Sequence, residues 1–322
     1  MTVPIKPVRV VTVTPNPSLD RTVEVDRLVP GTVIRASAMR EDPGGKGVNV
    51  ARALAANGVA CTAVLPLGGR DGRLLADLLD ELGLAYRSVA VAPSTRSNVT
   101  VSDSRGTVTK LNVPGDALTP GELAALAEAA VDELGGASWL VGCGSLPTGA
   151  PDDFYARLAE LGHGAGVAVA VDTSGPALAA AVEAGVELIK PNLAELAELA
   201  GRELVSLDDV VAAAEATRER GVAMVVVSLG AYGAVLVGDG EPWLAVPPPV
   251  VARSDVGAGD SALAGFLAGG ASGPGALCSA VAWGTAAVSL PGTAVPGPDL
   301  IDPSLVTLRA ARGSQPLVRP PS

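Results

Sequence analysis

Residues 255–261, with the sequence Asp-Val-Gly-Ala-Gly-Asp-Ser, open an apolar helix-like stretch and are the part of the chain best suited to chemistry. Their small residues let backbone amides approach a ligand, and a helix N-terminus adds partial positive charge, so the segment favours an anion. Asp260 places a carboxylate inside this site, where it would repel a resting phosphate unless it had a chemical task. A base beside an anion cradle suits phosphoryl transfer to a hydroxyl, because the base takes the proton and the amides stabilise the moving phosphoryl group.

The same segment also fits the loose dinucleotide-binding pattern, as Gly257-x-Gly259-x-x-Ala262. Three features oppose that interpretation: the pattern lies late in the chain, no strong strand runs directly into it, and Asp260 occupies the place of a pyrophosphate. The stretch Trp283–Leu290 further along also offers no acidic residue to bind a ribose. The phosphoryl-transfer interpretation is therefore favoured.

A second glycine-rich segment, Gly-Gly-Lys-Gly-Val-Asn at residues 44–49, precedes a helix-like stretch. Its glycines allow close backbone approach, and Lys46 and Asn49 offer donors to a polar ligand. It is not a P-loop, because the Gly-Lys-Ser/Thr order is absent. The competing interpretation is a plain glycine-rich turn that caps a helix, and the segment alone does not choose between the two.

Two further segments combine possible chemistry with a structural explanation. Asn192 and Glu195 have the spacing of a capping box, but their oxygens also suit a hydrated Mg²⁺ at the carboxyl end of a strand. The apolar run that ends at Ser228 leads into a loop with Gly230 and Gly233, which either admits a nucleotide or forms a tight turn between strands.

Three isolated polar residues carry weaker signals. Asp20 follows the first strand and can accept hydrogen bonds from sugar hydroxyls, although an Asp in a proline-containing turn is common. Arg96 can bind a substrate phosphate, or it is a solvated surface arginine. His163 is the only histidine and supports no triad or metal cluster, so we expect it at the surface.

The composition limits the classes of partner. The chain has 322 residues and 48% apolar content, but aromatics make up only 2%, so the core must be built from Ala, Val and Leu. A net charge of −11 argues against nucleic acid or an anionic membrane as the main partner. The 3 cysteines are widely spaced and form no disulfide or zinc pattern. With neither a signal core nor a run of membrane-spanning length, we expect a soluble cytoplasmic protein.

Strand-like apolar runs alternate with longer amphipathic stretches along most of the chain. The predicted strands are Val8–Val13, Ala60–Leu65, Trp139–Cys143, Val167–Val171, Leu188–Lys190 and Met224–Ser228. The predicted helices are Gly47–Asn57, Gly72–Leu82, Gly121–Leu134, Asp152–Leu161 and Val210–Arg220. This alternation predicts a mostly parallel sheet covered on both faces, with ligands beyond the carboxyl ends of its strands.

Two regions alternate polar with apolar residues instead, which predicts exposed, half-buried strands. They comprise Arg21–Leu28, Thr32–Ala36, Ser97–Val101 and Thr107–Val113. We interpret them as a small β-lid whose bare edges and outer face favour a partner subunit, with ordinary surface hairpins as the alternative. The proline-rich segment 313–322 is expected to be a disordered tail.

Taken together, these segments resemble the PfkB family of ribokinase-like sugar kinases. Residues 44–51 and 255–260 look like the two signatures of that family, and Gly144-Ser145-Leu146-Pro147 and Lys190-Pro191-Asn192 lie where the family has them. The resemblance runs from Thr12 to beyond Phe266. Two departures are Asp255, where the family more often has Thr, and Cys143, where Ser is commoner. Asp255 adds negative charge near the nucleotide phosphates and is expected to weaken or redirect ATP or Mg²⁺ binding.

The resemblance implies a three-layer α/β/α sandwich with a mostly parallel sheet and a β-lid. It implies one kinase domain at residues 1–312, with the lid from about 17–40 and 95–113. The chain is most similar to the 1-phosphofructokinase branch, which implies ATP-dependent phosphorylation of fructose 1-phosphate at C6. Tagatose-6-phosphate kinase and the PfkB-type 6-phosphofructokinase are the alternatives, and a non-catalytic sugar-phosphate or nucleotide sensor is the alternative from another class.

The resemblance also assigns roles to residues. Asp260 would be the base, helped by the amides of Gly257, Ala258 and Gly259. The sugar phosphate would contact Asp20, Gly45, Lys46, Asn49, Ser145 and Arg96, with Arg35 from the lid of a partner in a homodimer. The nucleotide would contact Lys190, Asn192, Ser228, Gly230, Gly233, Gly257 and Gly259. Asn192 and Glu195 would hold Mg²⁺ through water.

Overall fold

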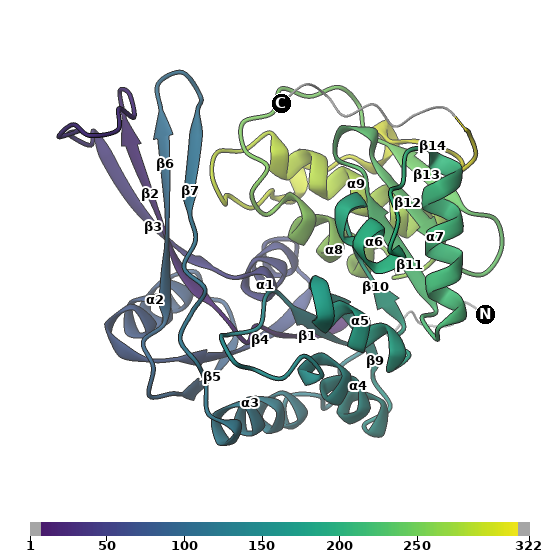
Figure 1. Cartoon of the computed structure of the whole chain (residues 1–322), viewed down its shortest axis with the longest axis horizontal. Helices are drawn as coiled ribbons and strands as arrows, with labels where there is room; N and C mark the ends of the chain where they lie inside the picture. Colours follow the sequence, from purple (N-terminus) through teal and green to yellow (C-terminus); the bar gives the residue numbers. More distant parts are fainter. Residues whose placement is uncertain (1–7, 315–322) are drawn as a thin grey trace.

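A large sheet forms the centre of the molecule (Figure 1), whose computed structural model describes residues 8–314. In spatial order its strands are β14 (Thr307–Ala310), β13 (Trp243–Val246), β12 (Ala234–Val237), β11 (Met224–Ser228), β10 (Leu188–Ile189), β9 (Ala168–Asp172), β8 (Trp139–Cys143), β1 (Arg9–Val13), β4 (Ala60–Leu67) and β5 (Tyr86–Ala90). The strands from β11 to β5 pair in parallel, and β12, β13 and β14 extend the sheet by antiparallel pairs. The carboxyl ends of the parallel strands meet along one rim, where folds of this class bind ligands.

Helices cover both faces of this sheet. One face carries α3 (Pro120–Asp132), α4 (Phe154–Gly164), α5 (Gly175–Glu183), α6 (Leu193–Ala200) and α7 (Leu207–Glu219). The other carries α1 (Lys46–Ala56), α2 (Gly69–Glu81), α8 (Ala258–Ala268) and α9 (Gly273–Val288). This arrangement confirms the predicted three-layer α/β/α sandwich around a mostly parallel sheet.

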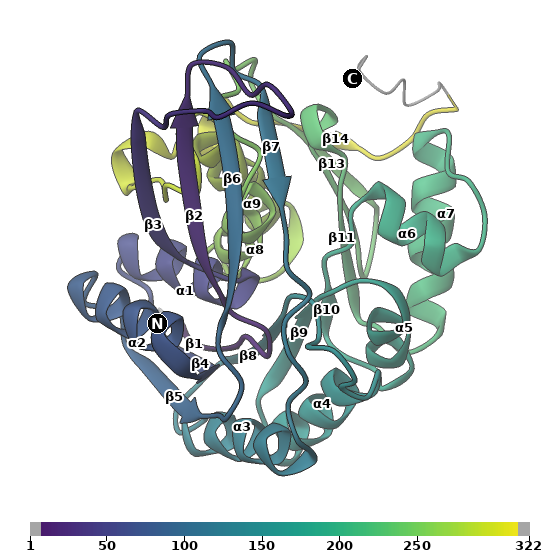
Figure 2. The same ribbon diagram turned by 60° about the vertical axis from the view of Figure 1, so that its left-hand side comes forward.

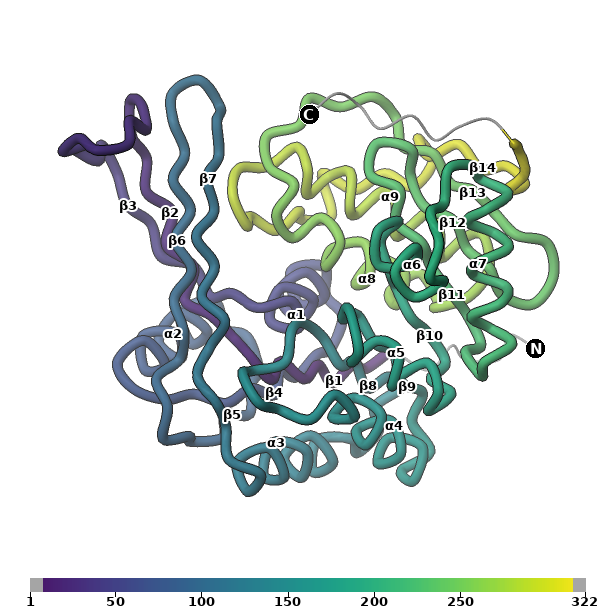
Figure 3. Tube along the Cα trace, viewed as in Figure 1, coloured from purple at the N-terminus to yellow at the C-terminus, as the bar shows by residue number. Residues whose placement is uncertain are grey.

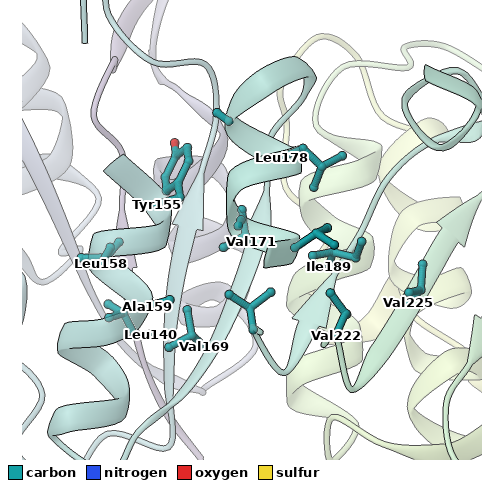
Figure 4. Packing of buried hydrophobic residues seen from close by; sticks show 14 of the residues in the cluster. Leu140, Tyr155, Leu158, Ala159, Val169, Val171, Leu178, Ile189, Val222 and Val225 are labelled. Carbon is teal, nitrogen blue, oxygen red and sulfur yellow. The ribbon is translucent and has the colours of Figure 1, made fainter. Parts of the chain in front are cut away.

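The core between the layers is mainly aliphatic, as the composition predicted. Figure 4 shows Leu140 and Val169 on neighbouring strands beside Leu158 and Ala159 of α4, all of them buried in one cluster. Tyr155 is also fully buried there, and its hydroxyl donates a 2.9 Å hydrogen bond to the carbonyl that follows β8. The core therefore supports the loop at the carboxyl end of β8, because a buried hydroxyl needs a partner.

A second sheet stands away from the main body (Figures 2 and 3), and we call it the lid sheet. Its strand order is β3 (Ala38–Gly44), β2 (Ser18–Val25), β6 (Arg96–Asp103) and β7 (Val108–Leu111). The strands β2 and β6 pair in parallel, whereas the two outer pairs are antiparallel. Arg21 joins the lid sheet to the body, because its guanidinium lies 3.0 Å from Asp71 of α2. The same guanidinium lies 2.9 Å from Glu41 of β3, within the lid sheet.

One predicted strand is wrong. Thr32–Ala36 lies in the loop between β2 and β3, and the strand that pairs with β2 begins at Ala38. The sequence of β3, Ala-Met-Arg-Glu-Asp-Pro-Gly, shows little apolar alternation because several of its side chains make ionic contacts instead. Of the segment 313–322 predicted to be a tail, residues 315–322 lie outside the described residues. Within residues 8–314, no helix is both long enough and apolar enough to span a bilayer.

Candidate active site

The candidate site is built around the N-terminus of α8. Gly257 caps the helix with a φ of 75°, in the left-handed region that glycine adopts readily. Ala258, Gly259 and Asp260 form the first turn, and the amides of a first turn have no acceptor within their own helix. The structure therefore contains the amide cradle that the sequence predicted, while its action on a phosphoryl group remains a prediction.

Asp260 is buried within this turn. It is 6% exposed, and its Oδ2 accepts a 2.9 Å hydrogen bond from Nδ2 of Asn49 in α1. Loss of water on burial raises the pKa of Asp260 to about 6, and repulsion from Asp172 acts in the same direction, against Lys46, Asn49 and Lys190. The carboxylate is thus ionised at neutral pH but holds a proton more firmly than an ordinary Asp, which suits a general base.

An ion cluster lies next to this base. Asp172 at the end of β9 is 1% exposed, with Oδ1 2.8 Å from Lys46 Nζ and Oδ2 2.9 Å from Lys190 Nζ. Burial alone would raise the pKa of Asp172, but the two ammonium groups outweigh it and lower that pKa. The sequence predicted both lysines and missed Asp172. The sequence feature that could have identified Asp172 is an acidic residue directly after a predicted apolar strand, at the rim where ligands bind.

The glycine-rich loop at residues 44–49 delivers two side chains to this cluster. Gly45 has a φ of 107°, which other residues rarely adopt, and a side chain at Gly47 would overlap a neighbouring threonine. Because α1 begins at Lys46, Lys46 and Asn49 lie one turn apart on the same side of the helix and reach the two buried carboxylates. The segment therefore begins a helix and also supplies polar groups, so the two interpretations are compatible.

Asp20 lies in the lid sheet near its junction with α1. Its Oδ1 accepts hydrogen bonds from Ser18 Oγ at 2.7 Å and from Asn98 Nδ2 at 3.0 Å. Burial raises the pKa of Asp20, and these two donors oppose the shift. Gly44 on the paired strand leaves the space that the Asp20 carboxylate occupies. Asn98 was not predicted as a site residue beyond its place in the segment around Arg96.

Arg96 begins β6 and lines a surface pocket together with Asn16. Its Nη1 donates to the Val113 carbonyl at 2.7 Å, and its Nη2 donates to the Asn16 carbonyl at 3.0 Å. Burial lowers the pKa of Arg96, with no loss of its positive charge at neutral pH. The side-chain Nδ2 of Asn16 lies 3.3 Å from Ser145 Oγ, so Arg96 and Ser145 both contact this asparagine.

Arg35 is exposed in the loop 26–37, which joins β2 to β3 at the end of the lid sheet farthest from α1 (Figure 1). Within one chain the structure does not bring Arg35 to Asp260. Its predicted contact with a substrate phosphate therefore requires a second copy of the chain.

Asn192 and Glu195 form the capping box of α6. Asn192 Oδ1 accepts hydrogen bonds at 2.9 Å from the amides of Ala194 and Glu195, and Glu195 Oε2 accepts one at 2.8 Å from the Asn192 amide. Glu195 also belongs to the carboxylates that raise the pKa of Lys46 against the effect of burial, so its charge acts on the site. Its second oxygen takes no part in the cap and suits a contact with metal-bound water.

The oxygen ligands offered by Asn192 and Glu195 suit a hydrated Mg²⁺ rather than a metal ion held only by protein side chains. Among residues 8–314, no group of three His, Cys, Asp or Glu side chains could hold a metal ion. Mg²⁺ usually keeps several waters and binds through one or two carboxylates and substrate phosphates. Glu195 fits that pattern, because it offers a single carboxylate at the rim of the sheet.

The predicted nucleotide loop follows β11. Ser228 forms a β-bridge with Asn192, which brings the end of β11 beside the capping box. Gly230 opens the 3-10 helix η1 (Gly230–Tyr232) and has open space around it. A side chain at Gly233 would overlap the Ala245 carbonyl, so Gly233 serves the tight turn between strands. Contacts of these residues with a nucleotide remain predictions.

Asp255 receives a partner from the lid sheet. Lys110 Nζ of β7 lies 2.8 Å from Asp255 Oδ1, and this hydrogen bond lowers the pKa of Asp255. The lid sheet therefore touches the loop before α8. Lys110 also offsets the negative charge that the sequence analysis placed near the nucleotide phosphates.

Known proteins share this fold and site. The chain matches the pfkB family of carbohydrate kinases over residues 14–300 and belongs to that family. It is a carbohydrate kinase, that is, a phosphotransferase, as the base beside the amide cradle predicted.

Its relatives include proteins named 1-phosphofructokinase and proteins named ATP-dependent 6-phosphofructokinase. A 1-phosphofructokinase from Rhodobacter capsulatus is 43% identical over 263 residues, which cover 80% of this chain and 83% of that protein. An ATP-dependent 6-phosphofructokinase isozyme 2 from Mycobacterium tuberculosis is 39% identical over 267 residues, covering 81% and 77%. The crystal structure of phosphofructokinase-2 from Escherichia coli in complex with substrates and products has a TM-score of 0.86 and 38% identity, covering 91% of this chain and 97% of that chain. The predicted family and fold class are therefore confirmed.

Proposed function

We propose that the protein transfers the γ-phosphoryl group of ATP to the C6 hydroxyl of fructose 1-phosphate and forms fructose 1,6-bisphosphate. The observation that carries the proposal is Asp260, a buried carboxylate with a pKa of about 6 in the first turn of α8, bonded to Asn49. A relative from Rhodobacter capsulatus that is 43% identical bears the name 1-phosphofructokinase, which supports the choice of substrate.

In this reaction Asp260 accepts the proton of the C6 hydroxyl. The freed oxygen forms a bond to the γ-phosphorus, and the bond between that phosphorus and the bridging oxygen of ADP breaks. Charge on the transferring group is stabilised by the amides of Gly257, Ala258, Gly259 and Asp260. Lys190 Nζ assists them, because it lies 3.3 Å from the position that a Cβ atom on Gly259 would take.

The sugar phosphate binds between the lid sheet and α1. Asp20 accepts hydrogen bonds from sugar hydroxyls, and Gly45 allows close approach of the ligand to the backbone. Lys46, Asn49 and Ser145 complete the polar surroundings of the sugar. Arg96 binds the phosphate that the substrate already carries, through the guanidinium that lines the pocket beside Asn16.

ATP binds along the rim between β10 and β12. Lys190, Asn192, Ser228, Gly230 and Gly233 line its site, together with Gly257 and Gly259. When bound, Mg²⁺ neutralises phosphate charge during transfer. Asn192 and Glu195 would hold the ion through water, with Glu195 using the oxygen that the helix cap leaves free.

The outer face of the lid sheet is suited to a second copy of the chain. Val23 pairs with Met39 on one side and Val101 on the other, and Val99 pairs with Leu111, which makes a continuous apolar surface. Met39 is 64% exposed and Leu111 is 58% exposed. Burial of such a surface favours a homodimer through the lid sheet, and the partner's β2–β3 loop would then supply Arg35.

A second candidate reaction is phosphorylation of fructose 6-phosphate at C1. The observation that favours it is the 39% identity to a protein named ATP-dependent 6-phosphofructokinase. Both reactions use the same base and the same amide cradle. They differ in which end of the sugar carries the existing phosphate, and therefore in the position of that phosphate relative to Arg96.

The test measures ADP release with Mg-ATP and fructose 1-phosphate, fructose 6-phosphate or tagatose 6-phosphate, each compared by kcat/KM. We expect the highest value with fructose 1-phosphate. A higher value with either of the other sugars would replace the proposed substrate and keep the kinase. Release of ADP with none of them, in a protein that binds nucleotide, would favour the sensor.

A further inference from the structure

Asp172 bridges the sugar side and the nucleotide side of the site. Its two carboxylate oxygens lie 2.8 Å from Lys46 Nζ and 2.9 Å from Lys190 Nζ. Lys46 belongs to the glycine-rich loop that opens α1, whereas Lys190 follows β10 and lies beside Gly259 in the amide cradle. One carboxylate therefore holds two cations that serve different substrates.

Because Asp172 and Lys190 are buried, each of these charges depends on its partners. Asp172 is 1% exposed and Lys190 is 5% exposed, so bulk water cannot replace either partner. A buried charge is strongly unfavourable unless it is paired, and removal of one partner leaves the others uncompensated. Without the carboxylate, the two ammonium groups would repel each other and leave their present positions.

We propose that Asp172 is a positioning residue that fixes Lys46 toward the sugar phosphate and Lys190 toward the transferring phosphoryl group as one rigid unit. This inference rests on the proposed kinase reaction and adds a residue to it. Asp172 itself does not contact the reacting atoms, because each of its oxygens faces a lysine.

Asp172 also acts on the base through its charge. The groups that face Asp260 are Asp172 from β9, Lys46 and Asn49 from α1, Lys190 after β10 and the Cys143 thiol of β8. Asp172 raises the pKa of Asp260 by repulsion, whereas both lysines lower it. If Asp172 loses its charge, its repulsion no longer raises the pKa of Asp260, so that pKa falls.

The experiment compares the wild type with Asp172→Asn, using the sugar phosphate that the wild type phosphorylates fastest. Asp153→Asn is the matched control, because Asp153 pairs with Arg157 on the exposed surface of α4. For each protein, kcat and both KM values are measured from pH 5 to 9, and circular dichroism checks the fold.

We expect kcat/KM of Asp172→Asn to fall by on the order of 10²-fold for both the sugar phosphate and ATP, because both lysines are misplaced. We also expect the acidic limb of its pH profile to move to lower pH. Asp153→Asn should match the wild type. A change for one substrate alone, or an unmoved acidic limb, would overturn the inference while the wild-type kinase activity stands.

If Asp172→Asn does not fold, the same measurements are made on Asp172→Glu. The glutamate keeps the charge but displaces the carboxylate by one methylene, so we expect reduced turnover with an acidic limb close to that of the wild type. Full wild-type turnover in Asp172→Glu would overturn the positioning role. A wild type with no kinase activity on any ketohexose phosphate would instead refute the proposed function.

Discussion

Asn49 Nδ2 donates a 2.9 Å hydrogen bond to Asp260 Oδ2 and joins two helix N-terminal regions that are 211 residues apart in the sequence. Asn49 lies in the first turn of α1, beside the lid sheet, and Asp260 lies in the first turn of α8. A residue assigned to the sugar therefore directly sets the orientation of the base.

Asp260→Asn should lose at least ~100-fold in kcat, because an amide cannot accept the hydroxyl proton. The variant should remain folded. Burial raises the pKa of Asp260 from 3.8 to about 6, so the folded protein binds a proton there that the unfolded chain has released. The contribution of this carboxyl to stability therefore decreases as the pH rises from about 4 to 6, and the amide avoids that loss. Kinetics and thermal melting at pH 7 test both points, and near-normal turnover would exclude Asp260 as the base.

The pH profile of the wild type should show an acidic limb with a midpoint near the Asp260 pKa of about 6, because only the ionised form accepts a proton. Asn49→Ala should move this limb to higher pH, since the Asn49 hydrogen bond stabilises the carboxylate and lowers its pKa. Rate measurements at saturating ATP across pH 5 to 8 follow the shift. A limb that moves to lower pH would contradict this account of Asp260.

Arg96→Ala should raise KM for the sugar phosphate by about 10- to 100-fold, the usual worth of hydrogen bonds to a charged group. The KM for ATP should change far less. Arg105→Ala in the exposed turn of the lid sheet is a matched loss of positive charge at a distance from the site. Equal effects of Arg96→Ala on both Michaelis constants would show that Arg96 does not contact the substrate phosphate.

Lys110→Ala should raise KM for ATP by a few fold at low salt, because the negative charge of Asp255 then lies unpaired near the proposed site of the nucleotide phosphates. The side chain of Asp255 is 88% exposed, so the effect should fade as the ionic strength increases. Adding Asp255→Asn to Lys110→Ala should restore the wild-type KM. A persistent rise in the double variant would mean that Lys110 contacts the nucleotide by itself.

Leu111→Lys should weaken the proposed homodimer, because it places a charge on the outer face of the lid sheet. Val108→Lys is the matched control: it lies on the same strand, three residues away, with its side chain on the opposite face. Sedimentation over a range of protein concentrations reports the assembly. If both variants assemble like the wild type, the dimer does not use this face.

Local patterns predicted the elements that carry their own signal. The first turn of α8 is recognisable because its glycines and Asp260 are contiguous, and Lys46 and Asn49 are recognisable because they follow glycines at a helix start. Asp172 was missed because its role comes from Lys46 and Lys190, which only the folded sheet brings to it.

The strand β3 was placed wrongly for a related reason. Its Glu41 and Asp42 make ionic contacts, so the strand lacks the apolar alternation that identifies a half-buried strand from sequence. The loop at residues 32–36 showed that alternation without any pairing partner. At both places, backbone hydrogen bonding between strands determined where a strand formed, and the alternation of apolar side chains did not.

The chain passes from β3 into α1 with Gly45 as the only residue between strand and helix. A single residue therefore separates the lid sheet from the helix that carries Asn49. Because Asn49 donates the hydrogen bond that lowers the pKa of Asp260, the lid sheet is connected to the proposed base through Gly45, one turn of α1 and one hydrogen bond.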